Sequence, residues 1–189
     1  MPPLVKVTRE AILEAAVELV RQGGPGMLNA RAIATKLGCS TQPVFSNYAT
    51  MEALRRDVIR RGMEIWQART AQAMKSGEYP PYKASGMAYI RFAREEKELF
   101  RLCFMRPRQS KEVAEGSLPE AVVAVIMEGL GLTREEALAF HLQMWIYVHG
   151  IATMLATGYL DWDEETAGNL LTEAYQGARL RLERKREAK

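Results

Sequence analysis

Apolar residues recur along most of the chain at the spacing of amphipathic α-helices. In the first such run, from Ile12 to Val20, they stand three and four positions apart, which is the period of one helix face. Thr8 precedes the run and is its expected N-cap. The run ends at residues 23–26, where three glycines and a proline cannot continue a helix.

The second and third apolar runs are short and lie close together. Asn29 is the expected cap of the second helix, and Ser40 or Thr41 is the expected cap of the third. Gly38 stands between them and suits a tight turn of positive φ. Pro43 is tolerated in the first turn of the third helix, because the N–H groups there have no partner within the helix. Two short helices joined by such a turn form a candidate helix-turn-helix.

The rest of the chain continues the helical pattern. A long fourth helix begins at Thr50 and is broken at residues 79–82 by two adjacent prolines. After this break one helix is expected up to about Arg94 and a short one near residues 99–105, followed by a loop at 107–116. Two more helices are expected after the capping boxes at Ser117–Glu120 and Thr133–Glu136, and the last helix is expected from Asp161 onward. No alternating apolar and polar run predicts a strand. The expected fold is all-α with about nine helices: an N-terminal three-helix bundle with the helix-turn-helix, followed by a larger C-terminal helical domain.

Charge is distributed unevenly along the chain. Of the 189 residues, 48% are hydrophobic and 26% are charged, which is the profile of a soluble globular protein. The net charge of +3 is too small for a protein that coats nucleic acid. Residues 1–62 nevertheless carry nine Lys or Arg against five Asp or Glu, whereas residues 63–189 carry 17 against 18. On charge grounds, DNA binding is expected only in the first third.

Several kinds of chemistry lack the residues that they need. Cys39 and Cys103 are the only cysteines, so no disulfide framework is expected. His141 and His149 are eight positions apart with no carboxylate at a ligand spacing, so neither a metal nor a cofactor is expected. There is no nucleophile–base set and no pair of carboxylates, and the glycines at 23–26 follow a helix rather than the strand that a nucleotide loop needs. We therefore expect that the protein is not an enzyme.

The sequence also bears on location. The N-terminus lacks the long apolar core and the small-residue cleavage site of a signal peptide. The longest apolar stretch, residues 146–155, is too short and too interrupted to span a bilayer. A cytoplasmic protein is the expectation.

The third helix has side chains suited to reading DNA. Reading base edges needs short polar side chains on the outer face of a helix that fits the major groove. Val44 and Tyr48 are expected on the inner face of this helix. The outer face then carries short polar residues, flanked by phosphate-positioning charges on the second helix: Thr41, Gln42, Ser46 and Asn47, with Arg31 and Lys36. Gln42 and Asn47 each have a donor and an acceptor and can pair with adenine.

Three segments of this region match a known pattern: TREAILEAA at residues 8–16, RAIATKLGCS at 31–40 and PVFSNY at 43–48. They resemble the first helix, the second helix with its turn, and the recognition helix of the TetR family of transcriptional regulators. The likeness covers about residues 5–60, and the remainder agrees in length and helical architecture. The family's usual order in the recognition helix is Tyr then Phe, whereas here Phe45 precedes Tyr48, so Phe45 offers no hydroxyl to a phosphate.

The resemblance implies a homodimer that binds operator DNA. Residues 1–50 would form the helix-turn-helix DNA-binding domain, and residues 51–189 would bind ligand and dimerise. The expected DNA contacts are Arg31, Lys36, Ser40, Thr41, Gln42, Pro43, Phe45, Ser46, Asn47 and Tyr48. In this family the last two long helices pair with those of a second copy, so the apolar stripe of the last helix is the expected interface: Leu170, Leu171, Ala174, Tyr175, Ala178 and Leu182.

Large, adaptable side chains in the C-terminal region suit a mostly apolar pocket. The candidates lie on different predicted helices: Phe92, Phe104, Met105, Met127, Trp145 and His149. The same residue types fill ordinary cores, and His149 can equally be a satisfied core histidine, so both interpretations stay open. If these residues line a pocket, the effector is hydrophobic, of an aromatic or amphipathic kind, and His149 is its polar contact.

Two functional hypotheses follow from the sequence. The first is a ligand-responsive transcriptional regulator, most often a repressor in such families, which binds operator DNA as a homodimer and is released by a small hydrophobic effector. The alternative is an all-α small-molecule-binding protein or enzyme without DNA binding, whose helix-turn-helix order is incidental. A DNA mobility-shift assay separates the two hypotheses.

Overall fold

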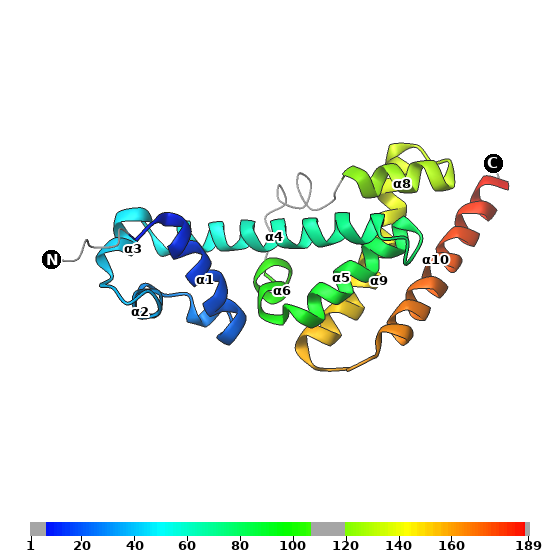
Figure 1. The fold of residues 1–189 in the computed structure, drawn as a ribbon. Coiled ribbons are helices and arrows are strands. Elements are labelled where there is room, and N and C mark those ends of the chain that lie inside the picture. The colour runs from blue at the N-terminus through cyan, green and yellow to red at the C-terminus, as the bar shows by residue number, and fades with distance from the viewer. Residues whose placement is uncertain (1–6, 107–119, 188–189) are drawn as a thin grey trace. The chain divides into compact units, whose positions relative to one another are not determined.

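The computed structural model describes residues 7–106 and 120–187. Over these residues the protein has nine α-helices, one short 3-10 helix and no strand (Figure 1). The all-α prediction is therefore confirmed. The expected loop at 107–116 and the expected cap at Ser117 lie outside the described residues.

The described residues divide into two compact units. The first unit comprises residues 7–65 and 96–106, and the second comprises residues 66–95 and 120–187. The boundary expected at residue 50 separates two functions, DNA binding before it and ligand binding with dimerisation after it. This boundary stays a prediction.

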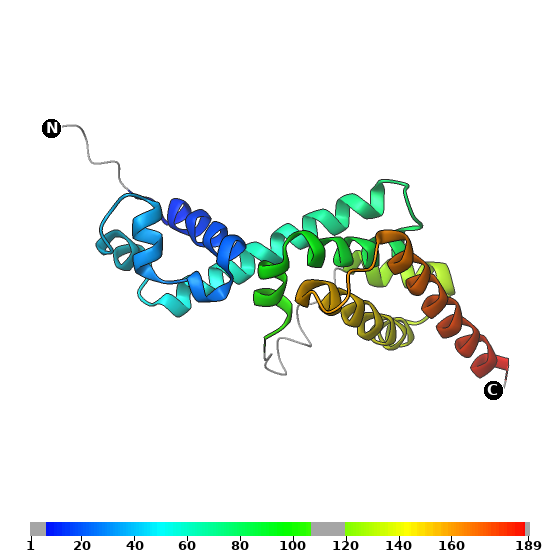
Figure 2. The same ribbon diagram turned by 90° about the horizontal axis from the view of Figure 1, so that it is seen from below.

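The first unit consists of short helices around α1. Its helices are α1 (Arg9–Gly23), the 3-10 helix η1 (Pro25–Met27), α2 (Ala30–Lys36), α3 (Gln42–Asn47), the first part of α4 (Met51–Lys75) and α6 (Lys97–Phe104). Helix α1 packs against α2, α3 and α6, as the two ribbon views agree (Figures 1 and 2). It begins at the expected cap, where the Thr8 hydroxyl accepts a hydrogen bond from the Ala11 N–H at 3.1 Å. Its buried face is the predicted apolar stripe: Ile12, Leu13, Ala15, Ala16, Val17, Leu19 and Val20.

A close approach holds α6 against α4 within the first unit. A Cβ added to Gly62 would stand 2.6 Å from the Cys103 sulfur, so only glycine fits there without displacing α6. Leu99, on the preceding turn of α6, is fully buried. Buried cysteine behaves as a small hydrophobe, and Cys103 fills this contact in that way.

The second unit consists of longer helices. They are the remainder of α4, then α5 (Pro81–Glu95), α8 (Glu120–Leu130), α9 (Arg134–Thr157) and α10 (Glu164–Glu187). Helices α5 and α9 form the most extensive pair, and α10 packs against both. Gly86 lets α10 approach α5, because a Cβ at this position would stand 2.8 Å from a methyl carbon of Leu171.

Both ends of α9 have the signals expected of a helix boundary. The predicted capping box at its N-terminus is confirmed, since the side chains of Thr133 and Glu136 each bond the other's backbone N–H. At its C-terminus Gly158 adopts a left-handed conformation with φ of 70°. These signals fix the start and the end of α9.

By length and composition alone, α9 is the one helix within the described ranges that is apolar enough to cross a membrane. The core helix of a soluble protein satisfies the same test. Eight residues of α9 are buried against its neighbours, among them Phe140, Met144 and Ile151. The other residues of α9 are half-buried or exposed, and 33% of its most apolar window is buried.

Candidate nucleic-acid interface

Helices α2 and α3 form the predicted helix-turn-helix. The Asn29 side chain accepts a hydrogen bond from the Ala32 N–H at 2.9 Å and so caps α2 as expected. Gly38 has a φ of 64°, which is the left-handed conformation expected in the turn. Ile33 and Val44 are fully buried and are the apolar anchors of α2 and α3 respectively. Thr41 stands at the N-cap position of α3, but its side chain makes no capping hydrogen bond.

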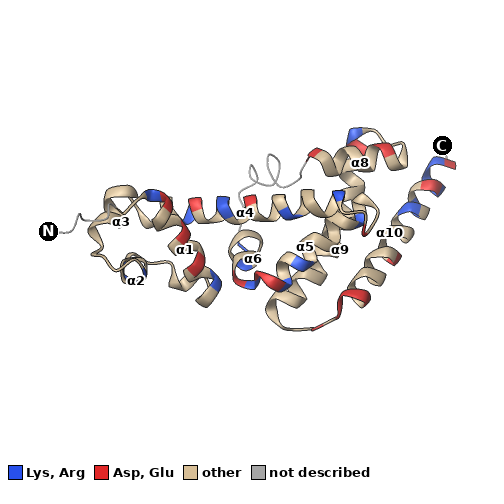
Figure 3. Ribbon diagram, in the orientation of Figure 1, with Lys and Arg blue, Asp and Glu red and all other residues tan. Residues whose placement is uncertain are grey.

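The outer face of α3 has no charged residue (Figure 3). Thr41, Gln42 and Ser46 are exposed. The Ser46 hydroxyl donates to the Gln42 carbonyl at 3.0 Å, so it keeps only its acceptor capacity for a ligand. Phe45 is 53% exposed, an unusual position for a large aromatic ring. Gln42 and Phe45 are therefore the two large side chains that α3 presents to solvent.

Two residues of the expected DNA-contacting set point inward instead. The Asn47 amide donates to the Pro43 carbonyl at 2.9 Å and to the Val7 carbonyl at 3.4 Å. Tyr48 is only 2% exposed, in agreement with its predicted place on the inner face. Both side chains hold the C-terminal end of α3 against its surroundings. Base reading by Asn47 would require its amide to leave these two carbonyls.

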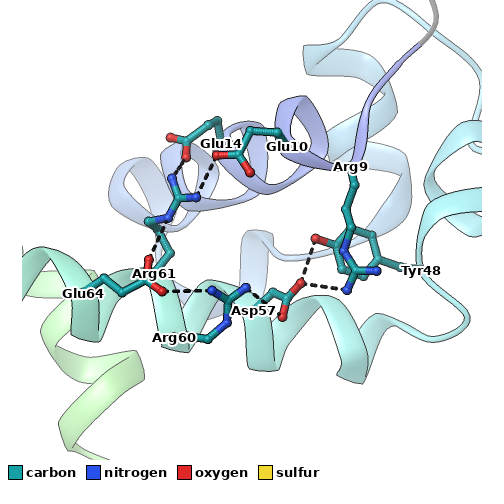
Figure 4. Close-up of polar contacts among 8 residues, drawn as sticks. All are labelled: Arg9, Glu10, Glu14, Tyr48, Asp57, Arg60, Arg61 and Glu64. Carbon is teal, nitrogen blue, oxygen red and sulfur yellow. Dashed lines mark hydrogen bonds and ion pairs between the residues drawn. The ribbon is translucent and has the colours of Figure 1, made fainter.

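A charged contact fixes Tyr48 from outside the apolar core (Figure 4). The same carboxylate oxygen of Asp57, Oδ2, accepts from the Tyr48 hydroxyl at 3.1 Å and from the Arg9 guanidinium at 2.9 Å. The Arg9 guanidinium also lies over the Tyr48 ring, 4.4 Å from its centre, at cation–π distance. The hydrogen bond from Arg9 lowers the pKa of Asp57, and burial raises the pKa of Tyr48. Asp57 is thus ionised and Tyr48 neutral at physiological pH.

Further ion pairs extend this contact along α4 to α1 (Figure 4). Arg60 pairs with Asp57 at 3.3 Å and with Glu64 at 2.9 Å. Arg61 pairs with Glu64 at 3.2 Å, with Glu10 at 2.7 Å, and also with Glu14. The eight side chains drawn in Figure 4 join α1, the end of α3 and the first part of α4 in one ionic network.

The network uses many of the cations that gave the first third its positive charge. Arg9, Arg60 and Arg61 all have carboxylate partners. Arg31 and Lys36 on α2 are exposed and have no ion pair within the part of the chain that the structure describes. Arg31 and Lys36 are therefore available to an external anion such as phosphate.

The six candidate ligand-binding residues do not all lie in one unit. Phe104 and Met105 belong to the first unit, and the other four belong to the second. Phe92 is fully buried and lies beneath the Arg69 guanidinium, 5.6 Å from ring centre to charge. Met127 is half-buried on α8. Phe92, Met127, Trp145 and His149 are the members of the expected set that lie in the second unit.

Trp145 and His149 meet as the sequence suggested. Their rings stack at 4.9 Å with planes 17° apart, and both residues are half-buried. His149 Nδ1 is 2.9 Å from the hydroxyl of Tyr89 on α5, and the indole of Trp66 on α4 meets the Tyr89 ring edge-on at 5.8 Å. An aromatic row therefore crosses from α4 through α5 to α9, with one polar pair inside it. The six candidates chosen from the sequence did not include Trp66 or Tyr89, although both have the aromatic character used to select the others.

A second Tyr–His pair lies on the same two helices. Tyr82 on α5 is 3.2 Å from Nδ1 of His141 on α9, and Phe140 and Tyr175 pack around it. Burial lowers the pKa of His141 to about 4, so this imidazole is neutral at physiological pH. This pair is a second contact between α5 and α9. It lies seven residues before Tyr89 on α5 and eight residues before His149 on α9.

Part of the expected dimer interface packs inside the second unit. Leu171 and Ala178 are buried, and Tyr175 contacts Phe140 edge-on at 5.7 Å. The other three residues are half-buried: Leu170, Ala174 and Leu182. A second chain could contact only the partly exposed members of this set.

The apolar stripe that is open to solvent lies on α9. Leu138, Leu142 and Ile146 follow one another at four-residue spacing and are 37%, 55% and 61% exposed. Their spacing places them on one helix face. The periodicity of α9 did not reveal this stripe in the sequence, because α9 is apolar on nearly every side.

Two searches, one for metal-binding groups among the described residues and one for related sequences among curated proteins, found nothing. Within residues 7–106 and 120–187, no group of three or more His, Cys, Asp or Glu side chains is placed to hold a metal ion. No curated protein matches the chain in sequence.

Comparison with known domains and solved structures gives the family. Residues 82–175 match the domain described as "Tetracyclin repressor-like, C-terminal domain". A TetR-like transcriptional regulator from Rhodococcus sp. RHA1 has the same fold, with a TM-score of 0.67 at 18% identity over 92% of this chain and 97% of that one. The multidrug binding protein EbrR, solved in complex with imidazole, superposes with a TM-score of 0.55 at 19% identity over 88% of each chain. The chain belongs to the TetR family of transcriptional regulators.

Proposed function

We propose that the protein is a ligand-responsive transcriptional regulator that binds operator DNA as a homodimer through α3. The observation that carries this proposal is the exposed, uncharged outer face of α3, with Gln42 and Phe45 extended into solvent. Gln and Ser side chains on such a face can hydrogen-bond base edges in the major groove, and Gln can pair with adenine through its donor and its acceptor. Arg31 and Lys36 on the neighbouring helix supply the phosphate contacts.

The contacts within the first unit divide the expected DNA-binding residues into two roles. Gln42, Thr41 and Ser46 read base edges, and Phe45 makes apolar contact with a thymine methyl group. Asn47 and Tyr48 hold the helix in place through the inward contacts described above. Ser40 and Pro43 lie at the start of α3 and approach the backbone of the duplex.

Dimerisation is proposed through the stripe Leu138–Leu142–Ile146, together with the partly exposed residues of α10. A contiguous exposed apolar stripe on a helix is a liability for a monomer and marks an interaction surface. Two-fold symmetry would pair this stripe with itself and present two copies of α3 to DNA. Repression, release by an effector and a cytoplasmic location are parts of the same proposal, and the protein is a regulator rather than an enzyme.

The effector is proposed to bind beside the row formed by Trp66, Tyr89, His149 and Trp145. Stacked aromatic rings with a single hydrogen-bonded pair suit a flat, mostly apolar molecule with one polar group. Imidazole is bound in the crystal of EbrR, a multidrug binding protein of similar fold, which is consistent with this kind of ligand. In operator-release titrations with aromatic amphiphiles, Trp145→Ala is expected to weaken the response while affinity for operator without the compound stays within twofold.

Selection from random DNA tests the central part of the proposal. The full-length protein should enrich a sequence made of two half-sites in inverted order, separated by about one helical turn or a multiple of it. Anisotropy titrations with the enriched duplex and a scrambled duplex of equal length then measure discrimination. A ratio of at least about a thousand is expected of a specific regulator. Equal affinity for the two duplexes would favour the alternative function without sequence-specific DNA binding.

A further inference from the structure

Helix α3 is held by unusually few apolar contacts. It has six residues, and Val44 is its only buried side chain. Its N-cap residue makes no side-chain hydrogen bond. A helix this short is not stable by itself. Its orientation therefore depends on the contacts that its ends make with the rest of the first unit. At the C-terminal end two side chains reach outside α3: the Asn47 amide donates to the Val7 carbonyl at 3.4 Å, and the Tyr48 hydroxyl donates to Asp57 at 3.1 Å.

We propose that Asp57 on α4 is a positioning residue for DNA reading, which fixes the angle of α3 by holding the Tyr48 hydroxyl. This inference rests on the proposed DNA-binding function. One carboxylate oxygen of Asp57 accepts from both Tyr48 and Arg9, while the other is paired with Arg60 (Figure 4). Asp57 therefore connects the end of α3 to the start of α1 and to α4 at once.

Asp57 acts on sequence reading rather than on general DNA affinity. Base contacts depend on the angle at which a recognition helix enters the groove, whereas phosphate contacts tolerate small displacements. Asp57 itself carries a negative charge, which repels DNA, so a direct favourable contact with phosphate is excluded for it. Loss of the carboxylate should therefore lower the affinity for operator selectively.

Asp57→Asn and Glu64→Gln form a matched pair for testing this role. Each removes one negative charge from α4 within the same ionic network. Among the described residues, Glu64 pairs with Arg60 and Arg61 and has no hydrogen bond or ion pair with α3. Asp57→Asn is expected to reduce the ratio of operator to scrambled-duplex affinity about tenfold, the size of one lost base contact. Glu64→Gln should keep the ratio within twofold of the unchanged protein.

Hydrogen exchange adds a readout that does not depend on DNA. The Tyr48 amide should exchange about tenfold faster in Asp57→Asn and within twofold of normal in Glu64→Gln, because only the first loosens α3. Tyr48→Phe keeps the buried ring, removes only the hydroxyl and should change exchange in the same direction as Asp57→Asn. It thereby keeps the test valid if Asp57→Asn fails to fold.

Two results would overturn the positioning role. One is an unchanged operator ratio and unchanged exchange in Asp57→Asn, and the other is an equal change in Glu64→Gln, which would mean a general effect of charge. If the unchanged protein prefers no duplex at all, the proposed function fails, and the exchange measurement alone decides whether Asp57 positions α3.

Discussion

The two units differ in where they keep their polar groups. In the first unit the ion pairs of Arg9, Asp57 and Arg61 lie around the outside of the helices, and the outer face of α3 is left uncharged. The second unit also has ion pairs at its surface, such as Arg91 with Glu78, but it adds partly buried polar pairs between helices, where Tyr82 and Tyr89 on α5 hydrogen-bond the two histidines of α9. The first unit is thus organised to present a surface, whereas the second is organised around its interior.

This difference explains why candidate functional residues were easier to choose in the first unit. The exposed side chains that we propose to read DNA are neighbours in sequence, from Thr41 to Ser46, so a local pattern contains them all. The polar pairs of the second unit join residues about 60 positions apart. No local pattern in the sequence contains such a pair.

The largest expected effect concerns the exposed stripe of α9. Leu142→Glu with Ile146→Glu should convert the proposed dimer into a monomer, because like charges would face each other across a self-complementary interface at a cost of several kcal/mol. Light scattering measures the mass. Both residues are exposed, so the monomer should stay folded by circular dichroism.

Tyr159→Glu is the matched control, because Tyr159 is exposed and lies beyond the end of α9. It should remain a dimer. A double variant that also remains a dimer would remove α9 from the interface. Leu171→Glu is unsuitable for this purpose, since Leu171 is buried in its own unit.

The next effect is a dependence of stability on pH that arises in the second unit. His141 has a pKa of about 4 in the folded protein and an ordinary value of 6.5 in the unfolded chain. Between these values the unfolded chain binds a proton that the folded protein does not, so stability falls as pH falls from about 6.5 to about 4. The loss attributable to His141 is about 3 kcal/mol.

Urea unfolding of the original protein and of His141→Gln at pH 7.0 and at pH 4.5 measures this loss. The variant should lose less stability between the two pH values than the original protein does. Equal losses would show that His141 is protonated equally easily in the folded and unfolded states.

Helix caps give a smaller effect that should appear in both units. Asn29→Ala removes the cap of α2 and should lower the free energy of unfolding by about 1 kcal/mol, as should Thr133→Ala at the start of α9. Thermal unfolding measures both changes. In addition, Asn29→Ala should weaken operator binding and Thr133→Ala should not, because only α2 belongs to the helix-turn-helix. If both variants weakened DNA binding equally, the assignment of DNA binding to the first unit alone would be contradicted.

The sequence was sufficient for most helices and for the caps of α1, α2 and α9, because these depend on neighbouring residues, whereas the expected side-chain cap of α3 is not formed. The positions of Thr8, Asn29, Gly38 and Thr133 followed from local rules and are confirmed. The fold class and the family followed from the same local patterns.

What could not be predicted depends on packing between distant segments. The Asn47 amide donates to the Pro43 carbonyl of its own helix and also to the Val7 carbonyl, 40 positions earlier, and only the first of these bonds is local in sequence. The hydrogen bond from Tyr48 to Asp57, and the one from Arg9 to the same oxygen, form only when α1 and α4 pack beside the end of α3. The apolar stripe of α10 has the same sequence pattern whether it packs inside its own unit or against another chain. The sequence therefore could not show that Leu171, an expected interface residue, is buried within its own unit.

Comparison of two single variants tests most directly whether α3 reads DNA sequence. Gln42→Ala should lose about 1–3 kcal/mol of binding to the enriched operator and almost nothing on the scrambled duplex. Arg31→Ala should weaken binding to both duplexes and lower the salt dependence by about one unit, as expected for a lost phosphate contact. Anisotropy titrations of the two variants on both duplexes at several salt concentrations give all of these values. Equal losses on operator and scrambled DNA for Gln42→Ala would contradict the assignment of α3 as the reading helix.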